Sequence, residues 1–170
     1  MLLKDCLCFQ VNRIARKMTR IIRELVSPYR LTTTQFFLLT ALYEEDGILI
    51  STLALKVALD RATLTGLLDR MERDDLIERR PDDEDRRAIR RYLTQKSEGL
   101  RRALTDLYHR NNSLFLSFLT EEEKNLFETA VARLKIADFK ESQEVRELPK
   151  NNLRILLALL PVFYVLTTGT

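Results

Sequence analysis

Residues 60–94 decide the fold of this chain, and they read DRATLTGLLDRMERDDLIERRPDDEDRRAIRRYLT. Apolar residues in the first half recur every three or four positions, which predicts a helix from Ala62 to about Arg73. The residues of its inner face are Leu64, Leu67, Leu68 and Met71. The second half predicts a β-hairpin, because residues 76–80 and 88–94 alternate in part and flank a charged tip without glycine.

The outer face of the predicted helix carries small and charged side chains. It consists of Thr63, Thr65, Gly66, Asp69, Arg70 and Arg73. A helix enters the major groove of DNA when that face lacks bulky apolar residues, and arginine supplies the forked donors that read base edges. Arg61 and Arg70 are therefore candidates for base reading. Arg86 and Arg87, at the hairpin tip, are candidates for contacts to the backbone or the minor groove.

Helices flank this stretch on both sides. Before it, the pattern predicts a long helix over residues 2–27, a second helix from the threonine run 32–34 to about 44–47, and a strand stub at 48–50. Ser51 is expected to cap a third helix, and Thr94 and Thr120 predict the starts of two more. This order is that of a winged helix-turn-helix. The expected fold class is mainly α with a small β-hairpin wing (α+β).

Composition narrows the function classes. The chain has 170 residues, 45% hydrophobic and 31% charged, which suits a protein with a buried core. Two cysteines cannot build a disulfide scaffold, and one histidine disfavours a metal site or a catalytic triad. We therefore expect a cytoplasmic protein that is not an enzyme, with no catalytic residues, no metal and no cofactor. Residues 1–30 hold seven Lys/Arg against two Asp/Glu, which fits either polyanion binding or a solvated surface.

Several segments together resemble the MarR family of bacterial transcription regulators. They are residues 31–36, 59–65, 68–77 and the wing pattern 82–87, followed by Leu93, Thr94 and Gly99. The resemblance spans about residues 8–137, and the tail after Lys140 has no counterpart in it.

The resemblance implies a homodimer that binds a pseudopalindromic operator in double-stranded DNA as a repressor, released by a small anionic aromatic effector. It divides the chain into an N-terminal dimerisation helix (1–30), a winged helix-turn-helix domain (31–99), and C-terminal dimerisation helices with an apolar tail (100–170). Asp85 is expected to hold an arginine, Arg70, in position. The candidate DNA-binding residues are Thr32, Thr33, Thr34, Arg61, Thr63, Thr65, Gly66, Arg70, Arg73, Asp85, Arg86 and Arg87.

Redox sensing through a cysteine is one alternative function. Residues 7–9 resemble a family branch that senses organic hydroperoxides through one N-terminal cysteine, here Cys8. In that branch tyrosines hold the cysteine, whereas the aligned positions here are Asn12, Ile22 and Thr33. We therefore expect Cys8 to pack as a small buried hydrophobe. The candidate effector or redox residues are Cys8, Asn12 and Arg16.

A protein-interaction module is the other alternative. Residues 153–166 are almost all apolar, but they are too few for a membrane span of about 20 residues and they contain Pro161. We expect this tail to pack as a buried helix between subunits, with no membrane contact.

The two cysteines do not suggest a disulfide. If Cys6 and Cys8 both lie on a helix, their side chains point apart, which disfavours a bond between them.

Overall fold

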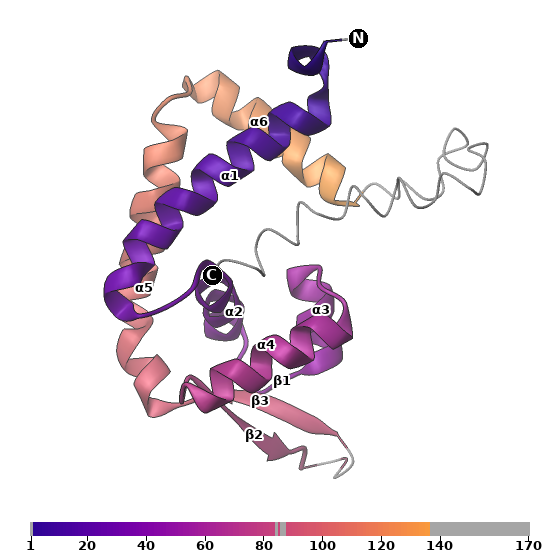
Figure 1. Ribbon diagram of the computed structural model, residues 1–170, viewed down its shortest axis with the longest axis vertical. Helices are drawn as coiled ribbons and strands as arrows, with labels where there is room; N and C mark the ends of the chain where they lie inside the picture. The colour runs from indigo at the N-terminus through magenta and orange to yellow at the C-terminus, as the bar shows by residue number, and fades with distance from the viewer. Residues whose placement is uncertain (1, 84, 86–87, 137–170) are drawn as a thin grey trace, which may run out of the picture. The chain divides into compact units, whose positions relative to one another are not determined.

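A computed structural model describes residues 2–83, 85 and 88–136 of the chain. These residues form two compact units, one ending at Tyr108 and the other beginning at His109, within helix α5 (Gln95–Leu116). Figure 1 shows the course of the chain and the labels of its elements. The predicted tail helix at 153–166 lies outside the described residues.

The first unit begins with a helical arm. A 3-10 turn (Leu3–Asp5) precedes α1 (Leu7–Val26), and Cys6 between them is extended, with ψ 109°. The prediction of one helix over residues 2–27 is therefore wrong at its start. Residues 3–5 bury no side chain that would hold another helical turn in place. A second 3-10 turn (Ser27–Tyr29) ends the arm, and the left-handed φ of 56° at Arg30 redirects the chain.

Three helices form the helix-turn-helix part: α2 (Thr33–Glu44), α3 (Ile50–Val57) and α4 (Arg61–Arg73). Thr32 and Gln35 form a capping box at the start of α2, as the threonine run predicts. The predicted cap of α3 is wrong, because strand β1 (Ile48–Leu49) ends directly before the helix and Leu49 takes the cap position. Ser51 therefore lies inside the first turn of α3.

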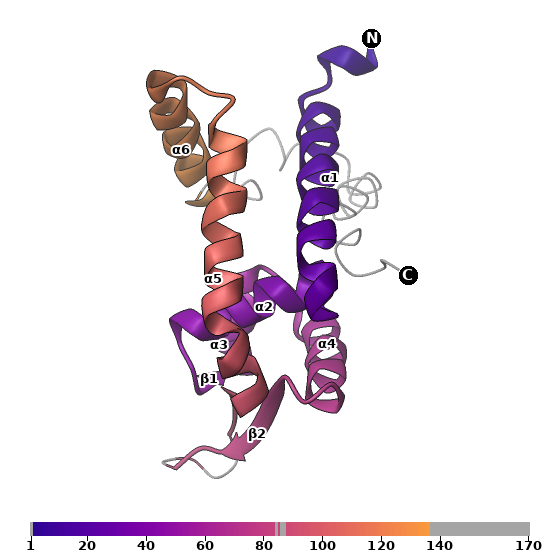
Figure 2. The ribbon, with the colours of Figure 1, turned by 90° about the vertical axis from the view of Figure 1, so that its left-hand side faces the viewer.

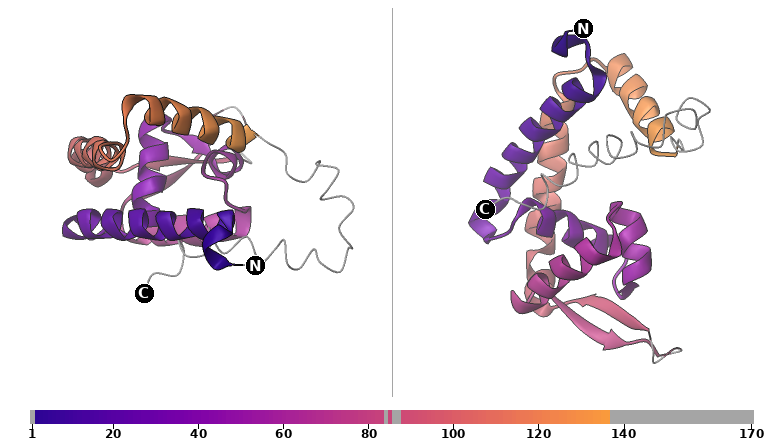
Figure 3. Two further views of the ribbon diagram at one scale, coloured as in Figure 1. Left: turned by 90° about the horizontal axis from the view of Figure 1, so that it is seen from above. Right: turned by 45° about the vertical axis from the view of Figure 1, so that its right-hand side comes forward.

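The predicted hairpin follows α4. Strands β2 (Ile77–Pro81) and β3 (Ile89–Leu93) pair antiparallel, and β1 adds to the other edge of β3, so the sheet order is β1-β3-β2. The hairpin extends from beneath α4 (Figure 1; Figure 3, right). The predicted fold class is confirmed: the described chain is mainly helical, with a small antiparallel sheet and a winged helix-turn-helix.

One hydrophobic core joins α2, α3, α4, the sheet and the start of α5. Its fully buried side chains include Phe36, Leu39, Leu53, Leu64, Leu68, Met71, Ile77 and Leu104. Burying one such side chain stabilises a fold by roughly 1.5–3 kcal/mol, so this core fixes the inner face of α4 firmly. The N-terminal end of α1 extends away from the core (Figure 2).

The second unit contains the end of α5 and helix α6 (Glu121–Ile136). Thr120 and Glu123 form reciprocal capping bonds of 2.8 and 3.3 Å, which confirms the predicted start of α6. The backbone N–H and the hydroxyl of Thr120 donate to the Glu123 carboxylate at 2.8 and 3.1 Å, and these two bonds hold the pKa of Glu123 below its usual range. Within residues 2–136 as described, the helices lack the combined length and apolar character that a membrane span requires.

Candidate nucleic-acid interface

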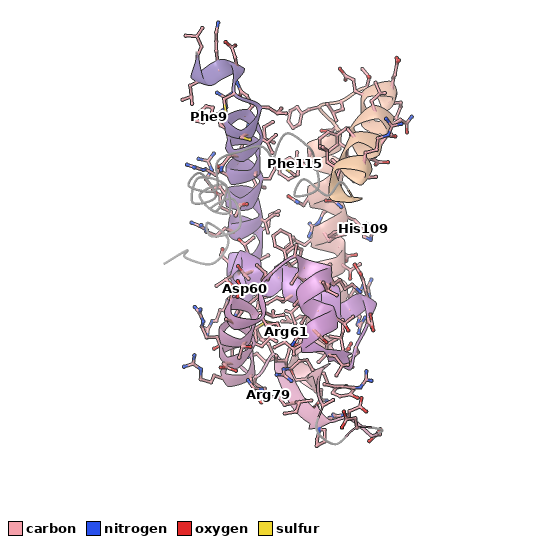
Figure 4. The ribbon with its side chains drawn as sticks, turned by 90° about the vertical axis from the view of Figure 1, so that its right-hand side faces the viewer. Phe9, Asp60, Arg61, Arg79, His109 and Phe115 are labelled. Atoms are coloured by element: carbon pink, nitrogen blue, oxygen red, sulfur yellow. The ribbon has the colours of Figure 1, made fainter. Side chains whose placement is uncertain are left out.

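The N-terminal end of α4 is held by Asp60 (Figure 4). One oxygen of its carboxylate accepts the backbone N–H of Thr63 at 2.9 Å, and the other accepts the Thr63 hydroxyl at 2.6 Å. These bonds lower the pKa of Asp60, so the carboxylate stays charged and caps the helix dipole. Arg61 is exposed directly after this cap.

The threonines on the outer face of α4 use their hydroxyl protons within the protein. Thr63 donates to Asp60, and Thr65 donates to the backbone oxygen of Arg61 at 2.7 Å. Each therefore offers a neighbour a methyl group and oxygen lone pairs rather than a donor. Thymine presents a methyl group in the major groove, so this chemistry suits contact with thymine more than with a phosphate.

Gly66 lies in the middle of the outer face, and a Cβ atom added there would meet nothing within 4 Å. Arg70 donates from Nε to the backbone oxygen of Gly66 at 3.3 Å, and Arg73 donates in the same way to Asp69. Both arginines are exposed. Among the described residues no acceptor is found for their remaining guanidinium N–H groups. The outer face is thus open, flat at Gly66 and cationic along one side.

The base of the wing is organised by Asp82, which is buried. Its carboxylate accepts the backbone N–H of Asp85 at 2.8 Å and pairs with Nε of Arg90. Arg90 also donates to the backbone oxygen of Gly47 at 2.8 Å, which ties the wing to the chain before β1. The tip that carries Arg86 and Arg87 thus starts from a fixed base, although these two arginines lie outside the described residues.

The expected pairing of Asp85 with Arg70 is wrong. Nε of Arg70 bonds to its own helix, and the acid shown with an arginine at the wing base is Asp82. Asp82 comes directly after β2, where its backbone N–H donates to the oxygen of Ala88 at 3.0 Å and its side chain reaches Arg90 of β3. Sequence reasoning missed Asp82, because a run of acids gives no sign of which one the strand register turns inward.

The threonine run before α2 divides into one surface residue and two buried ones. Thr32 is exposed, and its hydroxyl accepts the backbone N–H of Gln35 at 3.2 Å. Thr33 and Thr34 are only 6% and 7% exposed. The prediction that all three face a ligand is therefore wrong for Thr33 and Thr34, because the capping position fixes the helix phase and turns both side chains inward.

The candidate effector residues lie on α1. Nε of Arg16 donates to the side-chain oxygen of Asn12 at 2.6 Å. Cys6 and Cys8 are free thiols, and Cys8 is exposed in the single chain, so the prediction that it is buried is wrong there. Among the described residues no group of three or more metal-ligating side chains is found.

The described residues form a helix-turn-helix with a hairpin beside it. The second helix has an inner face buried in the core and an outer face that is open. This combination defines a winged helix-turn-helix protein of the DNA-binding class. The family model described as the MarR family matches residues 31–89. The chain is 37% identical over 105 residues to the HTH-type transcriptional regulator MgrA of Staphylococcus aureus. The matched stretch covers 61% of this chain and 71% of MgrA. The chain belongs to the MarR family of winged-helix transcription regulators, which are DNA-binding proteins and not enzymes.

Solved structures share this fold. A mutant MarR from E. coli complexed with operator DNA has a TM-score of 0.69 at 23% identity, covering 74% of this chain and 90% of that one. CouR from Rhodococcus jostii RHA1, bound to p-coumaroyl-CoA, has a TM-score of 0.71 at 19% identity, covering 82% of this chain and 98% of that one.

Proposed function

We propose that this chain is a cytoplasmic homodimeric repressor that reads a pseudopalindromic operator and is released by a small anionic aromatic effector. The observation that carries the proposal is the outer face of α4, which is open at Gly66 while the opposite face is sealed in the core. A helix fixed in this way can enter the major groove without rearrangement.

The proposed DNA contacts follow the chemistry of each exposed side chain. Arg61 and Arg70 read guanine edges through their forked donors, and Thr63 and Thr65 meet thymine methyl groups. Arg73 and Thr32 contact phosphates, which supply affinity but no sequence information. From the sequence we add Arg86 and Arg87, which reach the minor groove or the backbone from the wing tip.

The proposed partner for dimerisation is a second copy of this chain. Apolar side chains of α1 lie exposed, with Leu7 at 75%, Val11 at 53% and Ile14 at 58%. The second unit exposes Leu126, Phe127 and Leu134 on α6 in the same way. Apolar rows of this extent on two helices support burial against another chain. Two copies of α4 in a dimer would meet two half-sites, so the operator would be pseudopalindromic.

The proposed effector is a small aromatic anion. Exposed basic residues of α1 form one face of the helix, and they are Arg13, Arg16, Lys17, Arg20 and Arg23. That face is suited to a carboxylate or a phosphate. A likeness to CouR, whose solved structure holds p-coumaroyl-CoA, supports an aromatic ligand with an anionic group. Effector binding would favour a state of the dimer in which the two copies of α4 no longer match the operator.

A second candidate function is redox sensing through Cys8, because its thiol is exposed in the single chain. Oxidants reach an exposed thiol more readily than a buried one, and neighbouring cations stabilise the reactive thiolate. In that case an oxidised Cys8, rather than a bound anion, would release the DNA.

Selection of duplexes from a random pool with the purified full chain tests the DNA-reading proposal. The expected result is one enriched motif with two inverted half-sites about one helical turn apart. Enrichment of no motif, or of a motif with a single half-site, would contradict the proposed mode of reading.

A further inference from the structure

One face of the β2–β3 hairpin changes from apolar to cationic where it leaves the core. Ile77 and Leu93 stand opposite each other and are both buried. Side chains on a strand face repeat every second residue, so the next pair on this face is Arg79 and Arg91, which are also in direct register. Like charges placed opposite each other on neighbouring strands destabilise a sheet. This position therefore requires compensation from elsewhere.

Arg91 is the buried member of this pair. It is 5% exposed, Nη1 donates to the backbone oxygen of Ile89 at 3.2 Å, and Nε is buried without a hydrogen-bond partner. Burial lowers the pKa of Arg91, and the neighbouring charge of Arg79 lowers it further. A guanidinium in such a place costs folding free energy unless carboxylates lie close by.

Helix α4 supplies those carboxylates. Arg79 donates from Nη2 to Asp69 and from Nε to Glu72, the latter at 2.8 Å. Asp69 and Glu72 are three positions apart, so they lie on one side of α4. They also act on Arg91, whose pKa they raise against the effects of burial and of Arg79. Two guanidinium groups of the sheet and two carboxylates of α4 thus form one charge cluster between the helix and the wing.

We propose that Arg79 is a positioning residue for DNA reading, which fixes the pitch of α4 against the wing. Arg91, on the neighbouring strand, attracts the same two carboxylates of α4. The forked guanidinium holds two carboxylates of α4 at once, which sets the angle of the helix as well as its distance. A fixed angle lets α4 and the wing meet one duplex in a single register. The inference depends on the proposed roles of α4 and the wing as the DNA-reading elements.

The test compares Arg79→Met with the charge-matched control Arg80→Met, using full-length protein. Arg80 is the next residue, lies on the opposite face of the sheet, pairs with Glu78 and stacks on the ring of Tyr92 at 4.7 Å. Fluorescence anisotropy measures affinity for the duplex selected from the random pool and for a shuffled duplex of the same composition. Arg79→Met is expected to lower the ratio of the two affinities about tenfold or more, whereas Arg80→Met leaves it within about twofold.

Two further readouts separate positioning from direct contact. A residue that contacts a phosphate changes the dependence of log affinity on log salt by about one unit, whereas Arg79→Met is expected to leave that slope unchanged. Arg79→Lys, which keeps the charge but loses the fork, is expected to recover only part of the ratio.

Urea unfolding shows whether Arg79→Met folds. If it does not, Asp69→Asn replaces it in the same assay. Asp69→Asn is expected to lower the affinity ratio at least threefold, which is about half of a tenfold change on a logarithmic scale.

An unchanged affinity ratio in the folded Arg79 or Asp69 variant would overturn the assignment. An equal loss in Arg80→Met, or a salt slope lowered by about one in Arg79→Met, would overturn it as well. A wild-type chain that selects no duplex would instead refute the proposed reading of DNA, and the assignment with it. The two failures are therefore distinguishable.

Discussion

The side-chain N–H₂ of Gln35 donates a hydrogen bond of 2.7 Å to the carboxylate of Asp74. Gln35 belongs to the capping box that starts α2, and Asp74 is the residue that ends α4. The same carboxamide accepts the backbone N–H of Thr32 at 2.8 Å through its oxygen. One side chain therefore links the start of α2 to the end of the proposed recognition helix across 39 residues.

Gln35→Ala is expected to lower the free energy of unfolding by about 1–2 kcal/mol, because it removes a helix cap and a bond to a charged group together. Urea unfolding followed by circular dichroism measures the change. The control is Gln10→Ala, since the amide of Gln10 forms an exposed bond to the backbone oxygen of Lys4, six residues earlier in the chain. A change at Gln35 no larger than that at Gln10 would show that the link contributes little.

Gly66→Ala and Gly66→Leu separate stability from DNA binding. An added Cβ at Gly66 meets open space, so Gly66→Ala is expected to raise the free energy of unfolding by about 0.5–1 kcal/mol through helix propensity. Gly66→Leu should also fold, but its side chain would separate α4 from the floor of the major groove. Urea unfolding and mobility-shift assays on both variants give the two readouts, and full operator affinity in Gly66→Leu would argue that this face does not enter the groove.

Stability is expected to fall at alkaline pH because of Tyr43. Its phenol donates to the backbone oxygen of Ser97 at 2.7 Å, and Arg101 lies over its ring at 4.6 Å. Burial raises the pKa of Tyr43 to about 12, above the ordinary value of 10.0 for a tyrosine. The unfolded chain therefore loses this proton first, so the contribution of the phenol is complete below pH 10 and decreases as the pH rises from 10 to about 12.

Tyr43→Phe tests this pH dependence. Urea midpoints of wild type and variant are measured between neutral pH and pH 11. The gap between them is expected to close as the pH rises, because only the wild type carries the titrating phenol. A gap that stays constant over the whole range would rule out Tyr43 as its source.

Arg70→Ala and Arg87→Ala are each expected to weaken binding to the selected operator by at least ~1 kcal/mol. Arg102→Ala, which removes an exposed arginine of α5, serves as the control. Mobility shifts at one fixed salt concentration compare all three variants. If both test variants bind as tightly as wild type, the proposed contacts are wrong and the protein-interaction alternative gains support.

Cys8→Ser addresses the redox alternative. Under the effector proposal, peroxide treatment has the same effect on DNA binding by wild type and by Cys8→Ser. Mobility shifts before and after treatment measure this effect. Loss of binding in the wild type alone would favour redox sensing over release by an anion.

The sequence predicts the elements whose signals are local. The apolar spacing from Leu64 to Met71 locates α4, and the alternation on either side of the wing locates β2 and β3 to within one residue. Thr94 and Thr120 mark helix starts because a capping hydroxyl acts on a backbone N–H only three residues away.

Features that depend on register or on distant partners were harder to predict. Which acid of the wing faces inward is decided by the turn, so the buried carboxylate that pairs with Arg90 is that of Asp82. A capping position one residue earlier or later rotates the next side chains by about 100°, which explains the buried Thr33. Arg91 is a charged residue at a position of β3 where the alternation calls for an apolar one. The carboxylates that stabilise it lie on α4, about twenty residues earlier in the chain, which is beyond the reach of any local pattern.

Sedimentation analysis of the purified chain, alone and with the duplex selected from the random pool, tests the central claim most directly. Two chains that associate without DNA and then bind one duplex, with affinity that falls steeply as salt rises, are the predicted result. A chain that sediments as a monomer and binds no duplex even at low salt would contradict the claim that paired copies of α4 read DNA.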